Sequence, residues 1–240
     1  RLVGSEMCIR DRRDCSIQRN HQKMIEESPS AAVSSELREK MGHAAVTAAK
    51  AAGYVNAGTI EFLLEPDGKF WFMEMNTRIQ VEHPVTEWVT GIDLVKEQLK
   101  IASGMPLEIS QEDVRIQGHA IECRINAENP QKNFRPSPGT IQGAHFPGGN
   151  GIRVDTCVYN GCKIPPYYDS MLAKLIVHAG NRKEAIAKMQ SALGEVIIDG
   201  IDTNIDYQYE ILKDEDYQSG NFDTGFLASH ITAGVKINEN

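Results

Sequence analysis

The sequence predicts a mixed α+β fold, and three observations carry this prediction. Several runs of strand length alternate apolar and polar residues, and two longer stretches repeat apolar residues at helical spacing. A Pro-Asp-Gly-Lys turn separates two of the strand-like runs. With 41% hydrophobic and 24% charged residues, the composition is typical of a globular protein. The 240 residues suffice for one large domain or two small ones, at about 150 residues per domain.

The first half of the chain predicts three strands and two helices. Ser34 or Ser35 can cap the first helix, and Gly53 ends it. The Pro-Asp-Gly-Lys turn joins two of the strands into a hairpin. In order, the elements are a strand over 15–25, the helix before Gly53, the hairpin strands over 58–65 and 70–78, a loop at 83–84, and a helix over 92–102.

The second half predicts mainly strands. Residues 105–113 read as a linker, so the chain divides into two parts over 13–105 and 114–230. Asn181 and Glu184 resemble a capping box at the start of a helix that ends before Asp199. The remaining expected elements are strands over 117–126, 139–146, 152–159 and 171–178, followed by short irregular segments at the end of the chain.

Charge and cysteine content exclude several classes of protein. A net charge of −8 and a pI near 5.4 argue against a nucleic-acid binder that relies on bulk positive charge. No apolar run approaches the ~20 residues of a membrane-spanning helix, and no signal-peptide pattern is present. The five cysteines include no Cys-x-x-Cys pair, which favours reduced thiols in a cytoplasmic protein over a zinc ribbon or a disulfide framework.

The hairpin places two carboxylates opposite each other. A turn centred between Asp67 and Gly68 aligns Glu61 with Glu74 across the two strands. Strand alternation puts polar side chains on one face, namely Glu74, Asn76 and Arg78. The other face is apolar and suits a core, with Trp71, Met73 and Met75.

A cation would explain this pairing of like charges. Opposed carboxylates destabilise a sheet by ~0.2–1 kcal/mol unless something neutralises them. Glu61, Glu74 and the amide of Asn76 together offer hard oxygen donors, which suit Mg²⁺ or Mn²⁺ better than zinc. The alternative interpretation is a solvated sheet face whose carboxylates pair with nearby lysines and arginines.

The segment after the hairpin is unusually rich in polar side chains. Residues 74–84 read Glu-Met-Asn-Thr-Arg-Ile-Gln-Val-Glu-His-Pro, which closely resembles the signature of biotin carboxylases, members of the ATP-grasp enzymes. Further segments resemble the same family in the same order, at 13–23, 118–128, 136–139, 165–171 and 198–201. The resemblance covers about 13–227. It implies the C-terminal part of an ATP-grasp domain over 13–105, followed by a biotin carboxylase C-terminal domain over 114–230.

This resemblance implies an ATP-dependent carbon–nitrogen ligase. The expected reaction is ATP- and bicarbonate-dependent carboxylation of biotin through carboxyphosphate, with Mg²⁺ or Mn²⁺ as the metal. Biotin is carried by a biotin carboxyl carrier protein, and carboxyltransferase subunits complete acetyl-CoA carboxylase, which serves fatty acid synthesis. The full-length form is expected to be a homodimer. Tyr167, Tyr168 and Asp169 lie either near its interface or in an ordinary packed loop.

The resemblance also implies roles for individual residues. Glu61 and Glu74 are the implied metal ligands, with Asn76 near a second ion, which agrees with the hairpin pairing. Gln18 and His21, expected on the strand over 15–25, are the implied nucleotide contacts.

A second group of residues is implied in catalysis. Arg78 can hold carboxyphosphate or bicarbonate bidentately through its planar guanidinium, and Glu82 is the implied general base for bicarbonate. Gln80 and the Val81 main chain are implied to contact bicarbonate, and Lys23 is implied to contact bicarbonate and the transferred phosphate. Arg124 is implied to contact the biotin enolate oxygen.

Several of these residues also allow a structural interpretation. Glu82 can act only to orient Arg78, and Lys23 can be a surface residue of an edge strand. Arg124 can form a structural salt bridge in the neighbourhood of Glu122. His119 alternates with apolar residues on the other face of the same strand, so a core role is expected for it.

The family pattern implies that this chain is a fragment. Family members are about twice as long, and no glycine-rich phosphate loop occurs in this sequence. Residues 1–12 depart from the family and suggest a false junction, such as an artefact of sequencing or assembly. No Met-Lys-Met-like biotinylation site follows the last motif. This favours a free-standing parent subunit that acts on biotin carried by another protein over a longer pyruvate or acyl-CoA carboxylase cut at this point. Residues 1–240 alone are expected to be inactive.

Two alternatives stay open at this point. Another ATP-grasp ligase, such as one that forms carbamoyl phosphate, would share the paired carboxylates and the asparagine. A non-catalytic module that dimerises with a full-length partner would explain why the sequence lacks the glycine-rich phosphate loop.

Overall fold

The computed structural model describes residues 2–3 and 13–231 and divides the chain into two compact units. Unit 1 comprises Arg1–Arg13 and Ser28–Gln117, and unit 2 comprises Asp14–Glu27 and Gly118–Asn240. Every strand pairing that the structure details is antiparallel, and helices accompany the sheets, so the mixed α+β prediction is confirmed. Apart from Leu2–Val3, the junction expected at 1–12 lies outside the described residues.

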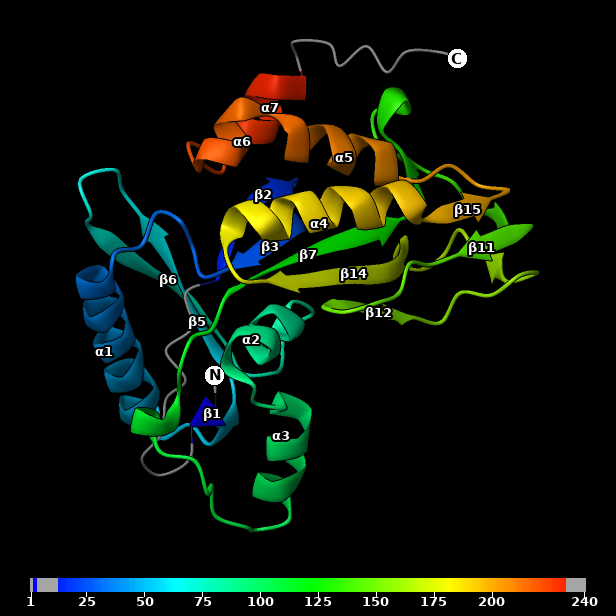
Figure 1. The fold of residues 1–240 in the computed structure, drawn as a ribbon. Coiled ribbons are helices and arrows are strands. Elements are labelled where there is room, and N and C mark those ends of the chain that lie inside the picture. The colour runs from blue at the N-terminus through cyan, green and yellow to red at the C-terminus, as the bar shows by residue number, and fades with distance from the viewer. Residues whose placement is uncertain (1, 4–12, 232–240) are drawn as a thin grey trace. The chain divides into compact units, whose positions relative to one another are not determined.

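The described residues of unit 1 form short sheets, three α-helices and one 3₁₀ helix (Figure 1). Strand β1 pairs with β4, and β5 pairs with β6. The elements are β1 Leu2–Val3, α1 Ser35–Ala51, β4 Asn56–Ala57, β5 Thr59–Leu64, β6 Phe70–Asn76, α2 His83–Thr90, α3 Leu94–Ala102 and the 3₁₀ helix η1 Gln111–Asp113.

The helices of unit 1 follow local sequence signals. The Ser34 hydroxyl accepts a hydrogen bond from the main-chain N–H of Leu37 and caps α1, and Gly53 at φ +60° ends it, as predicted. The loop expected at residues 83–84 is instead the start of α2. Pro84 is compatible with this position because the first turn of a helix has no partner for its N–H groups.

Unit 1 buries some of its apolar residues and leaves others exposed. A small core contains Ala57, Ile92 and Leu94. The prediction that the apolar face of the hairpin forms a core is wrong for the described chain, because Trp71 is 58% exposed and Met73 is 46% exposed. The hairpin therefore presents apolar surface to solvent in this chain.

Unit 2 contains a five-stranded sheet in the order β12-β14-β7-β3-β2. The sheet strands are β2 Asp14–Arg19, β3 Gln22–Ser28, β7 His119–Asn126, β12 Ile152–Thr156 and β14 Met171–Ala179. The remaining elements are β8 Glu128–Asn129, η2 Pro130–Lys132, β9 Arg135–Pro136, β10 Gly139–Thr140, β11 Gly143–His145, β13 Lys163–Ile164, α4 Arg182–Glu195, β15 Ile197–Asp199, α5 Ile205–Lys213, α6 Glu215–Ser219 and α7 Phe226–Ile231.

The single strand expected over 15–25 is wrong, because this segment is the hairpin β2–β3. Asn20 and His21 both have positive φ, at 50° and 62°. Two such residues in succession form the tight turn that matches the twist of antiparallel strands. The hairpin joins the sheet of unit 2, whereas the sequence grouped it with the residues before the linker.

Two further differences arise in the second half. The strand expected over 139–146 is broken, because β10 pairs with β13 whereas β11 pairs with β15. Between them, the N–H of Ile141 donates to Cys162 and the N–H of Gln142 donates to Asp199. Helix α5 has no counterpart in the sequence-based expectation.

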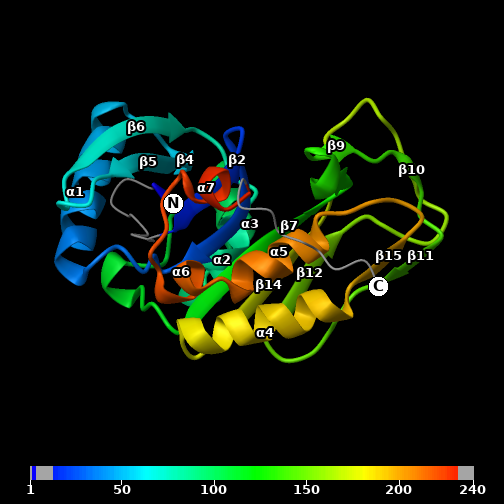
Figure 2. The ribbon, with the colours of Figure 1, turned by 90° about the horizontal axis from the view of Figure 1, so that it is seen from above.

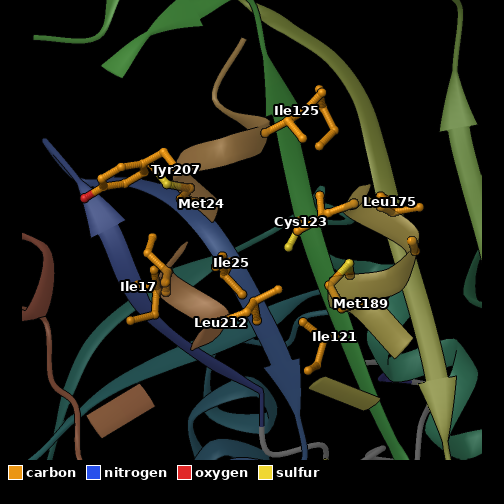
Figure 3. Close-up of a cluster of buried hydrophobic side chains, with 14 of the residues drawn as sticks. Ile17, Met24, Ile25, Ile121, Cys123, Ile125, Leu175, Met189, Tyr207 and Leu212 are labelled. Atoms are coloured by element: carbon orange, nitrogen blue, oxygen red, sulfur yellow. The ribbon is translucent and has the colours of Figure 1, made fainter. Parts of the chain in front are cut away.

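Helices α4 and α5 run side by side over one face of this sheet (Figures 1 and 2). Their apolar residues pack against those of the central strands. Figure 3 shows side chains of this core, which come from β2, β3, β7, β14, α4 and α5, including Ile17, Ile25, Ile121, Cys123, Leu175, Met189 and Leu212. Packing in this core fixes the positions of β3 and β7 relative to the helices. Both strands carry residues expected at the active site. No helix in the described residues is long and apolar enough to cross a membrane.

Candidate active site

The hairpin β5–β6 aligns Glu61 with Glu74, as predicted. The turn differs from the expected one, because the N–H of Glu65 donates to Lys69 and the loop has an odd number of residues. A bulge between Glu61 and Phe62 leaves Met73 without a cross-strand partner and restores the pairing. The bulge, together with the turn, therefore places the two carboxylates opposite each other.

The bulge also sorts the side chains between the two faces of the hairpin. Phe62 pairs with Phe72, and their ring centroids lie 6.5 Å apart. Because Leu63 pairs with Trp71, the register places Trp71 on the face of Glu61. The expectation that Trp71 lies on the opposite face is therefore wrong, since simple alternation does not continue through a bulge.

One amide side chain bridges the two carboxylates, and a second contacts Glu61 alone. The Asn76 Nδ2 atom donates to Glu61 Oε1 at 3.0 Å and to Glu74 Oε1 at 2.8 Å. Gln80 Nε2 donates to the same Glu61 oxygen at 2.5 Å, and Arg13 Nη2 donates to Gln80 Oε1 at 2.6 Å. Gln80 is buried, Glu61 is half-buried and Glu74 is exposed. The sequence did not predict the contact from Arg13.

This arrangement fits a hard divalent cation. Both carboxylates direct an oxygen at one donor group, which is where a positive charge would be stabilised. A half-turn of the Asn76 amide would bring its oxygen to the same place and complete a set of three oxygen ligands. The described residues contain no cluster of three or more His, Cys, Asp or Glu side chains. Mg²⁺ is commonly held by one or two carboxylates and completed by water and substrate phosphates, so the set suffices.

The residues that follow β6 lie on a short loop into α2. Arg78 is exposed, and its Nη1 donates to the carbonyl of Ile79 at 3.1 Å. Val81 is half-buried, and Glu82 is only 2% exposed at the N-cap of α2. A loop between a strand and a helix thus presents an exposed guanidinium four residues before a buried carboxylate.

Unit 2 carries the remaining predicted residues. Gln18 and Lys23 are directly paired across the hairpin β2–β3, so their side chains share one face. Both are half-buried, whereas His21 is exposed in the turn. The hairpin thus brings Gln18 beside Lys23, although the sequence had placed them on one continuous strand.

Arg124 on β7 pairs with a carboxylate that the sequence analysis overlooked. Its Nε donates to Glu26 Oε1 at 2.6 Å, and its Nη2 contacts the same oxygen. The Arg124 carbonyl accepts Asn204 Nδ2 at 3.0 Å and Gln208 Nε2 at 2.6 Å. Glu26, Asn204 and Gln208 are fully buried. The polar strand residue Glu26 carried no family motif, and helix α5 was not predicted, so little in the sequence pointed to these contacts.

A separate buried polar cluster lies on the other face of β3. Glu27 accepts from Arg182 Nε at 2.9 Å and lies 2.9 Å from His119 Nε2. His119 is 4% exposed, in agreement with the expected core role. The guanidinium of Arg182 also lies over the ring of Tyr217, 5.0 Å from its centroid. Burial, reinforced by the charge of Glu27, raises the pKa of Tyr217 well above its ordinary value.

Negative charge gathers where β3 and β7 meet. Cys123 is fully buried between Glu122 and Arg124 in the sequence. Burial raises the pKa of its thiol, and the charges of Glu26 and Glu122 raise it further. The Cys123 thiol is therefore a neutral core group and no nucleophile.

Comparison with known families places both halves of the chain. Residues 122–229 match the biotin carboxylase C-terminal domain. Residues 5–110 match the ATP-binding domain of the carbamoyl-phosphate synthase L chain.

Individual relatives agree with these matches. The chain is 59% identical to Biotin carboxylase 1 of Bacillus subtilis over 223 residues, which cover 92% of the chain and 50% of that protein. It is 57% identical to a pyruvate carboxylase subunit of Methanothermobacter thermautotrophicus, over 90% of the chain and 44% of the relative. The chain thus spans about half the length of the curated relatives it matches.

A solved structure shares the fold. The biotin carboxylase domain dimer of 2-oxoglutarate carboxylase from Hydrogenobacter thermophilus superposes with a TM-score of 0.89 at 52% identity. The match covers 91% of this chain and 48% of that one. That structure contains MgADP, ADP and bicarbonate.

The two units and their polar clusters define a class of protein. An ATP-grasp-type ATP-binding segment is followed by the C-terminal domain that accompanies it in biotin-dependent carboxylases. The chain belongs to the biotin carboxylase family and corresponds to a C-terminal portion of its members.

Proposed function

We propose that the protein to which this chain belongs carboxylates biotin, using ATP and bicarbonate, with carboxyphosphate as the intermediate. The observation that carries this proposal is the amide of Asn76 between Glu61 and Glu74, on a hairpin that leads directly to Arg78 and Glu82. Opposed carboxylates suit a phosphate-bound Mg²⁺ or Mn²⁺, and the following loop supplies an anion-binding guanidinium and a base. Bound metal would neutralise phosphate charge during transfer.

Individual residues take the following parts in this proposal. Glu61 and Glu74 hold the metal with Asn76, while Arg78 holds the planar anion bidentately. Glu82, buried next to the loop, removes the bicarbonate proton. Gln18 and His21 contact the nucleotide, and Lys23 contacts the transferred phosphate. Gln80 and the main chain of Val81 contact bicarbonate, and Arg124 contacts the biotin enolate oxygen.

The partners follow from the same proposal. Biotin is delivered on a biotin carboxyl carrier protein, and the full-length protein acts as a homodimer with carboxyltransferase subunits of acetyl-CoA carboxylase in the cytoplasm. The 2-oxoglutarate carboxylase domain is a dimer, which supports the homodimer, and the pyruvate carboxylase relative is named as one subunit of its enzyme, which supports assembly with further subunits. These relatives also make pyruvate and 2-oxoglutarate the alternative final acceptors.

A hybrid enzyme tests the proposal. Residues 13–230 replace the matching half of Biotin carboxylase 1 of Bacillus subtilis, to which the chain is 59% identical. We expect ADP release that depends on both bicarbonate and biotin. ADP release that ignores biotin would instead support another ATP-grasp ligase, and a folded hybrid without any activity would contradict both.

We also propose that residues 1–240 by themselves do not carboxylate biotin. The chain spans only 50% of the Bacillus subtilis relative and 44% of the pyruvate carboxylase subunit, and its sequence contains no glycine-rich phosphate loop. The 240-residue chain, assayed beside the hybrid, is expected to give no ATP-dependent carboxylation. Activity in the isolated chain would contradict this, and enhancement of a full-length partner by the inactive chain would support a dimerising module.

A further inference from the structure

Adjacent residues on β3 direct two buried carboxylates to opposite faces of the sheet. Glu26 is fully buried and Glu27 is 2% exposed. Because successive side chains of a strand point to opposite faces, Glu26 lies on the face of Arg124 and Glu27 on the face of His119 and Arg182. Glu26 thus contacts a residue of the proposed site, whereas Glu27 contacts His119 and Arg182, which have no part in it.

A buried carboxylate needs a charged partner. An isolated carboxylate loses much hydration free energy on burial and is retained only when it is paired and hydrogen-bonded. Arg124 supplies this partner through Nε and Nη2, both to Glu26 Oε1. Contacts to both Nε and Nη2 fix the plane of a guanidinium group. Glu26 therefore restricts the directions in which Arg124 can donate hydrogen bonds.

The main chain of Arg124 is fixed as well. Its carbonyl accepts two hydrogen bonds, from Asn204 and Gln208, and the Asn204 oxygen accepts the N–H of Asn126 at 2.8 Å. Both amide residues are fully buried at the start of α5. Arg124 is therefore held at its backbone by a helix and at its side chain by a neighbouring strand, while 16% of its side chain stays exposed.

We infer that Glu26 is a positioning residue for Arg124. It acts through the guanidinium and touches neither biotin nor the phosphates. This inference rests on the proposed role of Arg124 toward the biotin enolate oxygen. A preorganised donor stabilises developing negative charge far better than one that must reorient during the reaction. Loss of the Glu26 charge should therefore slow carboxylation of biotin and leave the earlier steps on ATP and bicarbonate unchanged.

The kinetic test compares Glu26→Gln with Glu27→Gln in the hybrid enzyme. Both changes keep side-chain size and remove one buried, paired negative charge. Because a charge-assisted hydrogen bond is about twice as strong as a neutral one, we expect Glu26→Gln to lower kcat for biotin carboxylation about tenfold. Bicarbonate-dependent ADP release without biotin should stay within about twofold. Glu27→Gln should leave both rates within about twofold while lowering the melting temperature to a similar degree.

A direct measurement of Arg124 accompanies the kinetics. In ¹⁵N-labelled 240-residue chain and hybrid, the Arg124 Nε–H resonance is assigned by its loss in Arg124→Lys. We expect slow hydrogen exchange at this group in the unchanged protein and in Glu27→Gln, and exchange at least about tenfold faster in Glu26→Gln.

The outcomes separate this inference from the proposed function. Equal losses of biotin-dependent turnover in both glutamine variants, or unchanged Arg124 Nε–H exchange in Glu26→Gln, would overturn the inference. A hybrid that is inactive before any substitution would overturn the proposed function, and the exchange measurement would still decide whether Glu26 holds Arg124.

Discussion

At the scale of single residues, Arg78 differs from the other polar side chains of the hairpin region. Asn76 and Gln80 are tied to Glu61 by hydrogen bonds, whereas Arg78 is exposed and donates to the carbonyl of the next residue. An exposed guanidinium beside a carboxylate site can exchange a main-chain contact for a planar anion. Its planar fork, rather than its charge alone, is what suits carboxyphosphate.

Substitution of Arg78 tests this requirement. In the hybrid enzyme, Arg78→Lys keeps the charge but loses the bidentate contact, so we expect turnover to fall about a hundredfold or more. Binding of ATP, measured by calorimetry, should stay within a few-fold. Turnover close to that of the unchanged hybrid would show that Arg78 is not the anion-binding arginine.

Pairs of residues were predictable where the pattern was local. The turn signal predicts the alignment of Glu61 with Glu74, and the structure confirms this pairing, although a shifted turn and a bulge together produce it. The location of Trp71 was wrong because the bulge at Met73 interrupts the alternation. A bulge depends on how the whole hairpin twists and packs, which no single residue type announces.

At the scale of elements, β7 and β14 form the centre of the unit 2 sheet and approach each other closely at one end. Gly118, which precedes β7, has φ +68°, and a Cβ atom there would lie 2.2 Å from the Ala179 carbonyl oxygen. Gly161 has φ +86° but has nothing within 4 Å of such an atom. The two glycines therefore share the same backbone requirement and differ only in crowding.

Substitution of these glycines separates crowding from backbone strain. We expect Gly161→Ala to lower the free energy of unfolding by about 1 kcal/mol through its positive φ alone. Gly118→Ala should lower it by at least about 2 kcal/mol more, because main-chain atoms of β14 must move. Chemical denaturation of the 240-residue chain measures both. Equal losses would show that β14 adjusts freely at Ala179.

Two elements illustrate why element prediction was incomplete. The sequence made residues 15–25 one strand, because the turn at Asn20 and His21 contains no glycine or proline. Helix α5 was not predicted either; Asn204 precedes it without forming a side-chain cap, and its buried residues pack into the core. Tertiary packing stabilises both elements, so local signals underestimated them.

At the scale of the whole molecule, the core of unit 2 makes stability sensitive to alkaline pH. Tyr207 is buried in this core, with its ring 5.1 Å from that of Phe134. Burial raises its pKa to about 12, against a smaller opposing effect of Arg19. The phenol in the unfolded chain loses its proton near pH 10, so the folded state is favoured below pH 10 and loses this advantage as the pH rises toward 12.

Removal of the Tyr207 hydroxyl tests this linkage. The shift corresponds to about 2–3 kcal/mol of unfolding free energy lost between these pH values. We expect the fall in melting temperature of the 240-residue chain from pH 10 to 12 to be smaller in Tyr207→Phe. Tyr167→Phe, at a residue that is 87% exposed, serves as the control and should leave the fall unchanged. Identical curves for all three proteins would contradict the role of Tyr207.

Local patterns in the sequence were enough to predict the α+β class and to recognise the family motifs, because both depend on residues close together along the chain. They also predicted the pairing of Glu61 with Glu74, which the folded hairpin reaches through a bulge. The tertiary structure decided that the 14–27 hairpin joins the unit 2 sheet and that Arg124 is held by Glu26, Asn204 and Gln208. The partners of Arg124 lie about 80 to 100 residues away in sequence. Their meeting requires a packed core, since burial is what makes an unpaired carboxylate or amide unfavourable and so selects these contacts.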